Sequence, residues 1–281
     1  MAGHSLEHFG ENPAVRHIPD AVLDLSDDAN YDQAVAVLAA LTDRLLDDVK
    51  DMDDDGVRQP SLLPGWSRGH VLTHIARNAD ALCNIVEWAR TGVEKPGYSS
   101  IEARNAAIEA GSGRSASELE ADIDASGERL LEAIAGLPRD RRHVIVRTGS
   151  SGIEAPAHDI LWWRIREVGY HHVDLGIGYG FDDLPTPVLI RGLDEAVDRV
   201  RLKGGPPLWL DTTDEVAWSS RGGSSRAGMS PDDADGPLQH GADRAQLVQG
   251  SLADLLAWLT GRSAGEDLRS DQPLPALPAW G

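Results

Sequence analysis

The chain has 281 residues, which at about 150 residues per domain predicts about two domains. Its 46 acidic and 26 basic residues give a formal net charge of −20, which argues against a general nucleic-acid binder or a protein that adsorbs on anionic membranes. A hydrophobic content of 41% and a charged content of 26% are typical of a globular protein. The one cysteine, Cys83, excludes an internal disulfide framework and a thiolate-rich metal site.

The N-terminal residues show no targeting signal. Residues 1–22 have neither the basic nor the apolar region of a secretory signal, and no apolar run in the chain approaches the roughly 18 residues of a membrane span. We therefore expect a cytoplasmic protein in which residues 1–30 form an N-terminal extension.

Four segments within residues 31–180 have the apolar spacing of three and four that indicates helices. They cover residues 32–50, 67–90, 117–135 and about 156–176. Ser67 can cap the second helix and Gly92 can close it. A long connection, residues 91–115, separates the second and third helices, and residues 143–147 could be a short strand or a loop. This pattern predicts a four-helix bundle.

The sequence changes in character after Gly176, where glycines and prolines indicate a boundary. Residues 181–281 predict a smaller α+β domain, so the fold class of the chain is α+β. Its expected parts are helices at 188–203 and 251–260, β-like runs at 208–210, 215–219 and 245–248, a flexible insertion at about 219–243 and a proline-rich tail at 273–281.

Two helices carry candidate metal ligands at the margins of their apolar stripes. Glu167 and His171 are four residues apart and project from one face of the fourth helix. The second helix offers His70 and His74, of which His74 lies at the edge of the apolar stripe while His70 points further toward solvent. Two histidines and one carboxylate leave a fourth position open, as in catalytic zinc sites.

Each of these residues also has a simpler interpretation. Glu167 and His171 could form a solvated pair, and His172 is expected to be a core histidine. Asp174 could be a partner that supports a ligand, or a surface carboxylate at the end of a helix. Cys83 is expected to be a buried structural thiol.

Several motifs resemble the mycothiol-dependent maleylpyruvate isomerases, which are DinB-like metal-binding bundles. The resemblance covers most of the chain from about Tyr31, and its matching segments are LLPGWSRGHVLTHIA (62–76), NADALCN (78–84), EARN (102–105), REVGYHHVDL (166–175), GSLA (250–253) and GR (261–262). The chain departs from the family in its N-terminal extension and in the insertion.

The resemblance implies a divalent metal, zinc, held by His74, Glu167 and His171, with mycothiol as the thiol cofactor. It also implies that Arg262 is a catalytic and substrate-binding arginine that faces the metal cleft, and that Arg104 is a second substrate contact.

The activity implied by the resemblance is the cis–trans isomerisation of maleylpyruvate to fumarylpyruvate in gentisate degradation, by reversible thiolate addition to the double bond. The alternatives are a mycothiol S-transferase acting on another electrophile and a non-catalytic regulator that binds metal or thiol. The expected partners are a small dicarboxylate and mycothiol, with no nucleic acid and no membrane, for a monomer or small homo-oligomer.

Overall fold

The computed structural model describes residues 24–148, 152–214, 219–221, 224–225 and 245–280. The chain divides into two compact units, of which one spans Asp20–Gly192 and the other contains Leu193–Gly281. Helices dominate and the sheets are small, which confirms the predicted α+β class.

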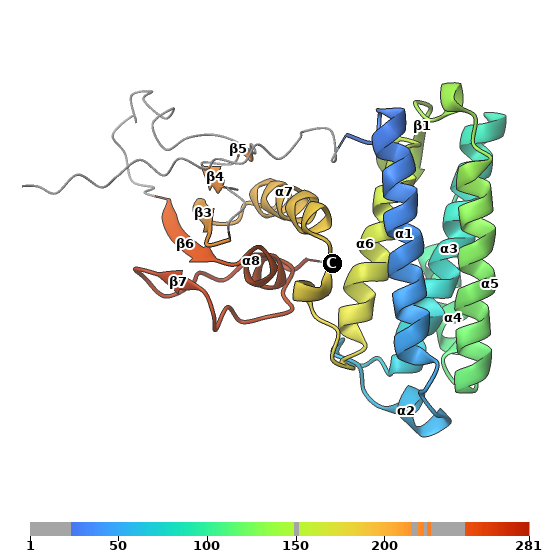
Figure 1. The fold of residues 1–281 in the computed structure, drawn as a ribbon, viewed down its shortest axis with the longest axis horizontal. Helices are drawn as coiled ribbons and strands as arrows, with labels where there is room; N and C mark the ends of the chain where they lie inside the picture. The colour runs from blue at the N-terminus through green and yellow to red at the C-terminus, as the bar shows by residue number, and fades with distance from the viewer. Residues whose placement is uncertain (1–23, 149–151, 215–218, 222–223, 226–244, 281) are drawn as a thin grey trace, which may run out of the picture. The chain divides into compact units, whose positions relative to one another are not determined.

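Four long helices form a bundle in the first unit (Figure 1). They are α1 (Asp28–Val49), α3 (Arg68–Thr91), α5 (Ala116–Ala135) and α6 (Asp159–Asp174). Helix α3 packs on α5 and α6, and α1 packs on the same two helices, so the four close a ring around one core. The predicted four-helix bundle is therefore confirmed, although the fourth helix begins at Asp159 instead of near Pro156.

Local sequence explains where helix α3 begins and ends. The Ser67 hydroxyl accepts a hydrogen bond from the backbone N–H of His70, and Nδ1 of His70 accepts one from the backbone N–H of Ser67. This reciprocal pair is a capping box, with histidine in the place that glutamate or glutamine usually takes. At the other end, Gly92 has a φ of 76°, a left-handed conformation that glycine adopts without strain.

The long connection at 91–115 contains a helix that the sequence analysis did not predict, α4 (Ile101–Gly111). Ile108 is the one buried residue of this helix, so its sequence has no apolar period to detect. A short helix, α2 (Asp54–Arg58), was also missed. The segment at 143–147 proves to be part of an antiparallel hairpin of β1 (Ile145–Thr148) and β2 (Ile153–Pro156).

Two polar links join the end of α6 to the segment around the start of α3. The guanidinium of Arg68 donates to the carbonyl oxygens of Leu175 and Gly176, at 2.9 and 3.1 Å. The backbone N–H of Leu62 donates to the carbonyl oxygen of Asp174 at 2.8 Å. These bonds satisfy carbonyl groups that the helix end leaves without intrahelical partners.

The second unit is built on a five-stranded sheet in the order β5-β4-β3-β6-β7. Its strands are β3 (Leu208–Thr212), β4 (Ser219–Arg221), β5 (Ser224–Ser225), β6 (Gln246–Gly250) and β7 (Arg269–Ser270). The central pair, β3 and β6, is parallel, and the other pairs are antiparallel. The predicted strands at 208–210 and 245–248 are thereby confirmed.

The helices of this part of the chain match the expectation. Helix α7 (Thr186–Leu202) contains the boundary between the two units, and α8 (Leu252–Leu259) follows β6. Single 3₁₀ turns also occur at Arg139–Arg141 and Phe181–Asp183.

A flexible insertion was expected at about 219–243, but strands β4 and β5 lie at its start and extend the sheet. Residues 222–223 and 226–243 of this range lie outside the described residues. Most of the predicted run 215–219 lies outside them as well. Within the described residues, no helix is long and apolar enough to cross a membrane.

Gly69 is required where the first turn of α3 meets the end of α4. A Cβ atom at this position would lie 2.3 Å from the carbonyl oxygen of Ser112, a backbone atom that cannot rotate away. We expect Gly69→Ala to lower the free energy of unfolding by about 1–3 kcal/mol, measured by urea denaturation.

Gly113 provides the control, because a Cβ atom there would meet nothing within 4 Å. Gly113→Ala should change stability by less than about 0.5 kcal/mol. Equal effects of the two substitutions would contradict a close backbone approach at Gly69.

Candidate metal centre

Helices α3 and α6 bring His74, Glu167 and His171 together inside the bundle. Nε2 of His74 lies 3.0 Å from Oε2 of Glu167 and 3.1 Å from Nε2 of His171. The three potential ligand atoms all lie within 4.8 Å of one another, and within the described residues this is the one group of three or more such side chains. The residues favoured from the sequence therefore converge, as the helical wheels predicted.

The local positions of these residues explain the convergence. Glu167 and His171 are four residues apart on α6, so their side chains leave the helix on one face. His74 is buried within α3, whereas the side chains of Glu167 and His171 are 20% and 16% exposed. Two imidazole nitrogens and one carboxylate oxygen are donors that suit zinc, and three protein ligands leave one position for a further group.

Asp174 supports His171 from behind. Its Oδ2 lies 2.8 Å from Nδ1 of His171, and the residue is completely buried, so the interpretation of Asp174 as a surface carboxylate is wrong. A carboxylate on Nδ1 holds the proton there and leaves the Nε2 lone pair directed at the other two side chains, as is usual for histidine ligands of metals.

The environment sets the charges of the three side chains. Burial lowers the pKa of His74 to about 4, so this imidazole is neutral at pH 7. Burial would raise the pKa of Glu167, but hydrogen bonds from His171 and His74 outweigh it and hold the pKa well below its usual value. For His171, burial lowers the pKa, yet Asp174 and Glu167 raise it above the usual value. A metal ion would therefore compete with a proton mainly at His171.

Arg104 and Trp66 also lie at this site. Arg104 belongs to α4, and its Nη2 is 3.3 Å from Nδ1 of His74. The ring of Trp66 packs edge-on against the His74 ring, with centroids 5.6 Å apart, and lies 6.0 Å from the guanidinium carbon of Arg104. The sequence had indicated Arg104 but not Trp66, whose position in the loop before α3 carries no periodic signal.

The other histidines of these helices take no part. His70, one helical turn before His74, pairs instead with Glu109 at 3.2 Å. His172 is buried and stacks on Tyr179 with ring centroids 3.7 Å apart, as expected of a core histidine. Cys83 is half-buried, and burial raises the pKa of its thiol, which agrees with a structural role.

Arg262 lies in the second unit, just after α8. Its backbone N–H donates to the carbonyl oxygen of Ala257 at 2.8 Å, and its Nη1 donates to that of Thr260 at 3.3 Å. Because the structure describes the two units separately, the expected placement of Arg262 at the metal cleft stays a prediction.

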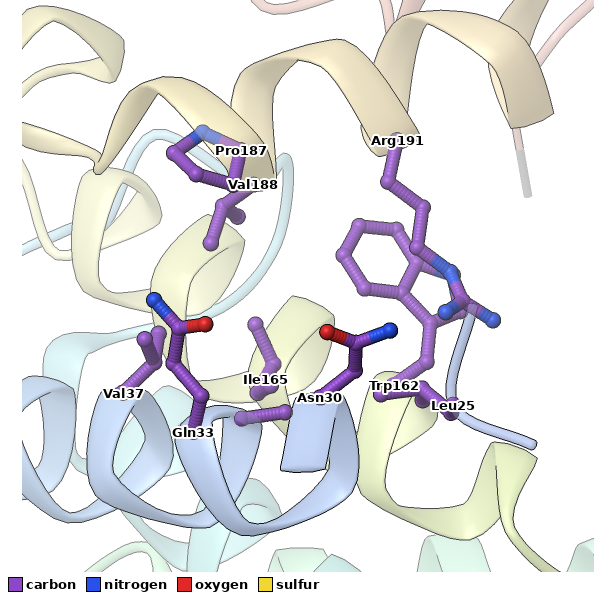
Figure 2. A pocket seen from close by; sticks show the side chains of 10 residues that line it. Leu25, Asn30, Gln33, Val37, Trp162, Ile165, Pro187, Val188 and Arg191 are labelled. Atoms are coloured by element: carbon purple, nitrogen blue, oxygen red, sulfur yellow. The ribbon is translucent and has the colours of Figure 1, made fainter. Parts of the chain in front are cut away.

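A pocket of the first unit lies on the side of α6 that carries Trp162 and Ile165 (Figure 2). Its lining residues come from α1, α6 and α7, with Leu25 ahead of α1, and include none of the three candidate ligands. Arg191, at the pocket, pairs with Asp159 at 2.8 Å and lies over the Trp162 ring. The walls of this pocket are mostly apolar, and Arg191 is paired with Asp159. The pocket therefore has no group of ligand or acid–base side chains like that of the candidate centre.

The fold and the site define the class of the protein: a four-helix bundle with a His-Glu-His centre between two of its helices, joined to a small α+β unit. Comparison with known proteins then gives the family. The sequence model described as mycothiol maleylpyruvate isomerase N-terminal domain matches residues 38–176. No curated protein matches the chain significantly.

Two solved structures resemble the chain over most of its length. The first is described as the crystal structure of the mycothiol-dependent maleylpyruvate isomerase; it is 30% identical, with a TM-score of 0.75 over 89% of this chain and 97% of that one. The second is a histidine-to-alanine variant of the same description, at 30% identity over the same shares, with a TM-score of 0.74. The chain therefore belongs to the family of mycothiol-dependent maleylpyruvate isomerases.

The two histidines of α3 give a direct test of the centre. Wild-type protein loaded with zinc and then desalted should retain about one ion per chain, and His74→Gln should retain almost none, because only two ligands remain. Metal content by elemental analysis measures the difference.

His70→Gln is the matched control, since glutamine at this position preserves the capping box. It should bind zinc as the wild type does. Retention of zinc by His74→Gln, or its loss in His70→Gln, would show that the three residues are not the ligands.

Proposed function

We propose that this chain catalyses the zinc- and mycothiol-dependent cis–trans isomerisation of maleylpyruvate to fumarylpyruvate, in the cytoplasm and as a step of gentisate degradation. The observation that carries the proposal is the convergence of His74, Glu167 and His171 in a chain that is 30% identical to an isomerase of this description over 89% of its length. The proposal also includes reversible thiolate addition to the double bond as the route of the reaction.

The residues of the centre fit a zinc ion. The donors are two nitrogens and one oxygen, two of the three side chains are free of a competing proton at neutral pH, and Asp174 orients the third. When bound, the metal lowers the pKa of the mycothiol thiol, and the resulting thiolate can add reversibly to the double bond and make it temporarily single. Cys83 is not required, because the reactive sulfur belongs to the cofactor.

Arg104 is suited to hold a carboxylate of the substrate. In the described part of the chain it forms no ion pair, and its guanidinium donates to Oδ1 of Asn105 and contacts Nδ1 of His74. A His74 that uses Nε2 as a ligand carries its proton on Nδ1, which then cannot accept a hydrogen bond from Arg104. Metal loading therefore releases a guanidinium beside the centre, where it can bind a carboxylate in the bidentate manner.

Arg262 is proposed to act from the second unit. The isomerisation of a conjugated keto acid places negative charge on the carbonyl group in the transition state, and a guanidinium stabilises such charge most where water is excluded. Binding a dianion also requires local positive charge in a chain whose net charge is −20. Arg104 and Arg262 supply that charge in this proposal.

The proposed activity is tested by product analysis. Zinc-loaded protein should convert maleylpyruvate to fumarylpyruvate only when mycothiol is present, and the free thiol should be fully recovered afterwards. Removal of zinc should abolish turnover and its return should restore it, while Cys83→Ser should remain fully active.

The alternatives give different results in the same assay. Loss of free thiol with formation of a stable conjugate would identify an S-transferase. Absence of turnover with any electrophile, together with a protein partner recovered by pull-down, would identify a regulator.

The two arginines are separable by kinetics. Arg262→Ala should leave the zinc content intact and lower kcat by about 100-fold, because it removes stabilisation of charge that develops in the transition state. Arg104→Ala should mainly raise KM for maleylpyruvate, because it removes a carboxylate contact that is present in the ground state as well.

Arg90→Ala is the control for a lost surface charge, since Arg90 is exposed and pairs with Glu87 on its own helix. It should leave both kinetic constants unchanged. Wild-type kinetics in Arg262→Ala would remove that residue from the site.

A further inference from the structure

A further polar link joins α3 and α6 directly beside the candidate metal centre. Nη1 of Arg164, on α6, donates to the backbone carbonyl oxygen of Ile75 at 2.7 Å and to Oδ1 of Asn78 at 3.0 Å. Ile75 follows His74 in α3, and Arg164 precedes Glu167 by three residues in α6. Residues three apart lie on one side of a helix. The hydrogen bonds of Arg164 and the three candidate ligands therefore lie next to each other, about one helical turn apart, in the interface between α3 and α6.

Arg164 is unusual because it is a buried charged residue whose hydrogen-bond acceptors are both neutral. Arg164 is 1% exposed and is one of the largest completely buried side chains of the described chain. Burial lowers its pKa to about 10, which still leaves a cation at neutral pH, and Glu167 is the charge that most opposes the shift. No carboxylate of the described residues forms an ion pair with Arg164, and its Nη2 has no hydrogen-bond partner there.

Stability alone does not account for such a residue. A buried cation without a carboxylate partner loses hydration that two neutral acceptors replace only in part, and apolar residues of similar size are often as stabilising or more so. Hydrogen bonds differ from apolar contacts in one respect: they are directional, whereas burial of apolar surface is not. The bond from Arg164 ends on a backbone oxygen of α3, so it holds the helix itself and not a movable side chain.

The candidate centre requires a fixed separation between α3 and α6. Glu167 and His171 are on one helix, so their spacing is set by the helix, but the distance from either to His74 depends on how α3 sits against α6. Metal ligands must be held within about 0.5 Å of the productive geometry. The Arg68 link restrains the same two helices, but only at their ends, next to Gly176.

We propose that Arg164 is a positioning residue of the metal centre, which fixes the separation and register of α3 and α6 through Ile75 and Asn78 so that His74 meets Glu167 and His171. This role rests on the metal centre proposed above and not on the identity of the substrate.

Metal affinity in the absence of any substrate tests the role. Arg164→Met removes both hydrogen bonds while it keeps most of the volume, and we expect it to weaken zinc binding about 10- to 100-fold, measured by competition with a chromophoric chelator. The absorption spectrum of the cobalt-substituted protein should change as well, because it reports the geometry of the ligands. The urea midpoint of the metal-free protein should change little.

Arg77→Met is the matched control. Arg77 also links two helices of the bundle, but it joins α3 to α5 through Asp122 at 2.7 Å and does not reach α6. Its replacement should lower the stability of the metal-free protein and leave zinc affinity within about twofold of the wild type, because the Arg77 link joins α3 to α5 and does not set the separation of α3 and α6.

Asn78→Ala is a second variant, and it tests the same role even if Arg164→Met does not fold. It removes one of the two acceptors and should weaken zinc binding by about 3- to 10-fold, and in combination with Arg164→Met it should cause no further loss, since both act through one link.

Wild-type zinc affinity and an unchanged cobalt spectrum in Arg164→Met and in Asn78→Ala would overturn the role of Arg164 while the metal centre stands. Failure of the wild-type chain itself to bind zinc would overturn the centre and this role together.

Discussion

The packing of α3 on α6 is the constraint on which the candidate site depends. Each helix alone carries an incomplete set of ligands, and Nε2 of His74 reaches Oε2 of Glu167 only because the helices lie side by side in the bundle. Apolar residues hold the two helices together, but directional bonds set their register. Arg68 supplies these bonds at one end of the interface, and Arg164 supplies them next to His74. The candidate ligand set is therefore complete only when the bundle has formed.

The charges near the candidate centre differ from those of the chain as a whole. The chain as a whole is strongly acidic, yet the neighbourhood of the centre contains Arg104 on α4 and Arg164 on α6, neither of which pairs with a carboxylate of the described residues. Burial keeps His74 neutral, and hydrogen bonds keep Glu167 ionised. A divalent ion there would have one carboxylate ligand, Glu167. With Arg104 and Arg164 nearby, the centre would keep a net positive charge even beside Asp174, which suits anionic ligands such as a thiolate or a carboxylate.

Strong periodicity made much of the fold predictable from the sequence. The four long helices and α7 and α8 have apolar stripes, and the expected strands at 208–210 and 245–248 have β-like composition. Helix α4 was missed because Ile108 is its one buried residue, so the amphipathic pattern on which the prediction depends is absent. Strands β4 and β5 were missed because their serine-rich sequence resembles a loop, and their structure is decided by pairing, of β4 with β3 and of β5 with β4.

For the site, the sequence by itself determined the candidate ligands, because spacing on a helix decides which side chains share a face: His74 was separated from His70, and Glu167 was joined to His171. The same spacing offered Asp174, three residues after His171, as a supporting carboxylate, but the sequence could not determine which residues of other elements contact the ligands. The contacts of Arg104 and Trp66 with His74, and of Arg164 with Ile75 and Asn78, join positions whose spacing along the chain follows no helical period. Such contacts depend on how the helices pack. Only the tertiary structure decides this packing, because it follows from the shape of whole interfaces and not from any local sequence pattern.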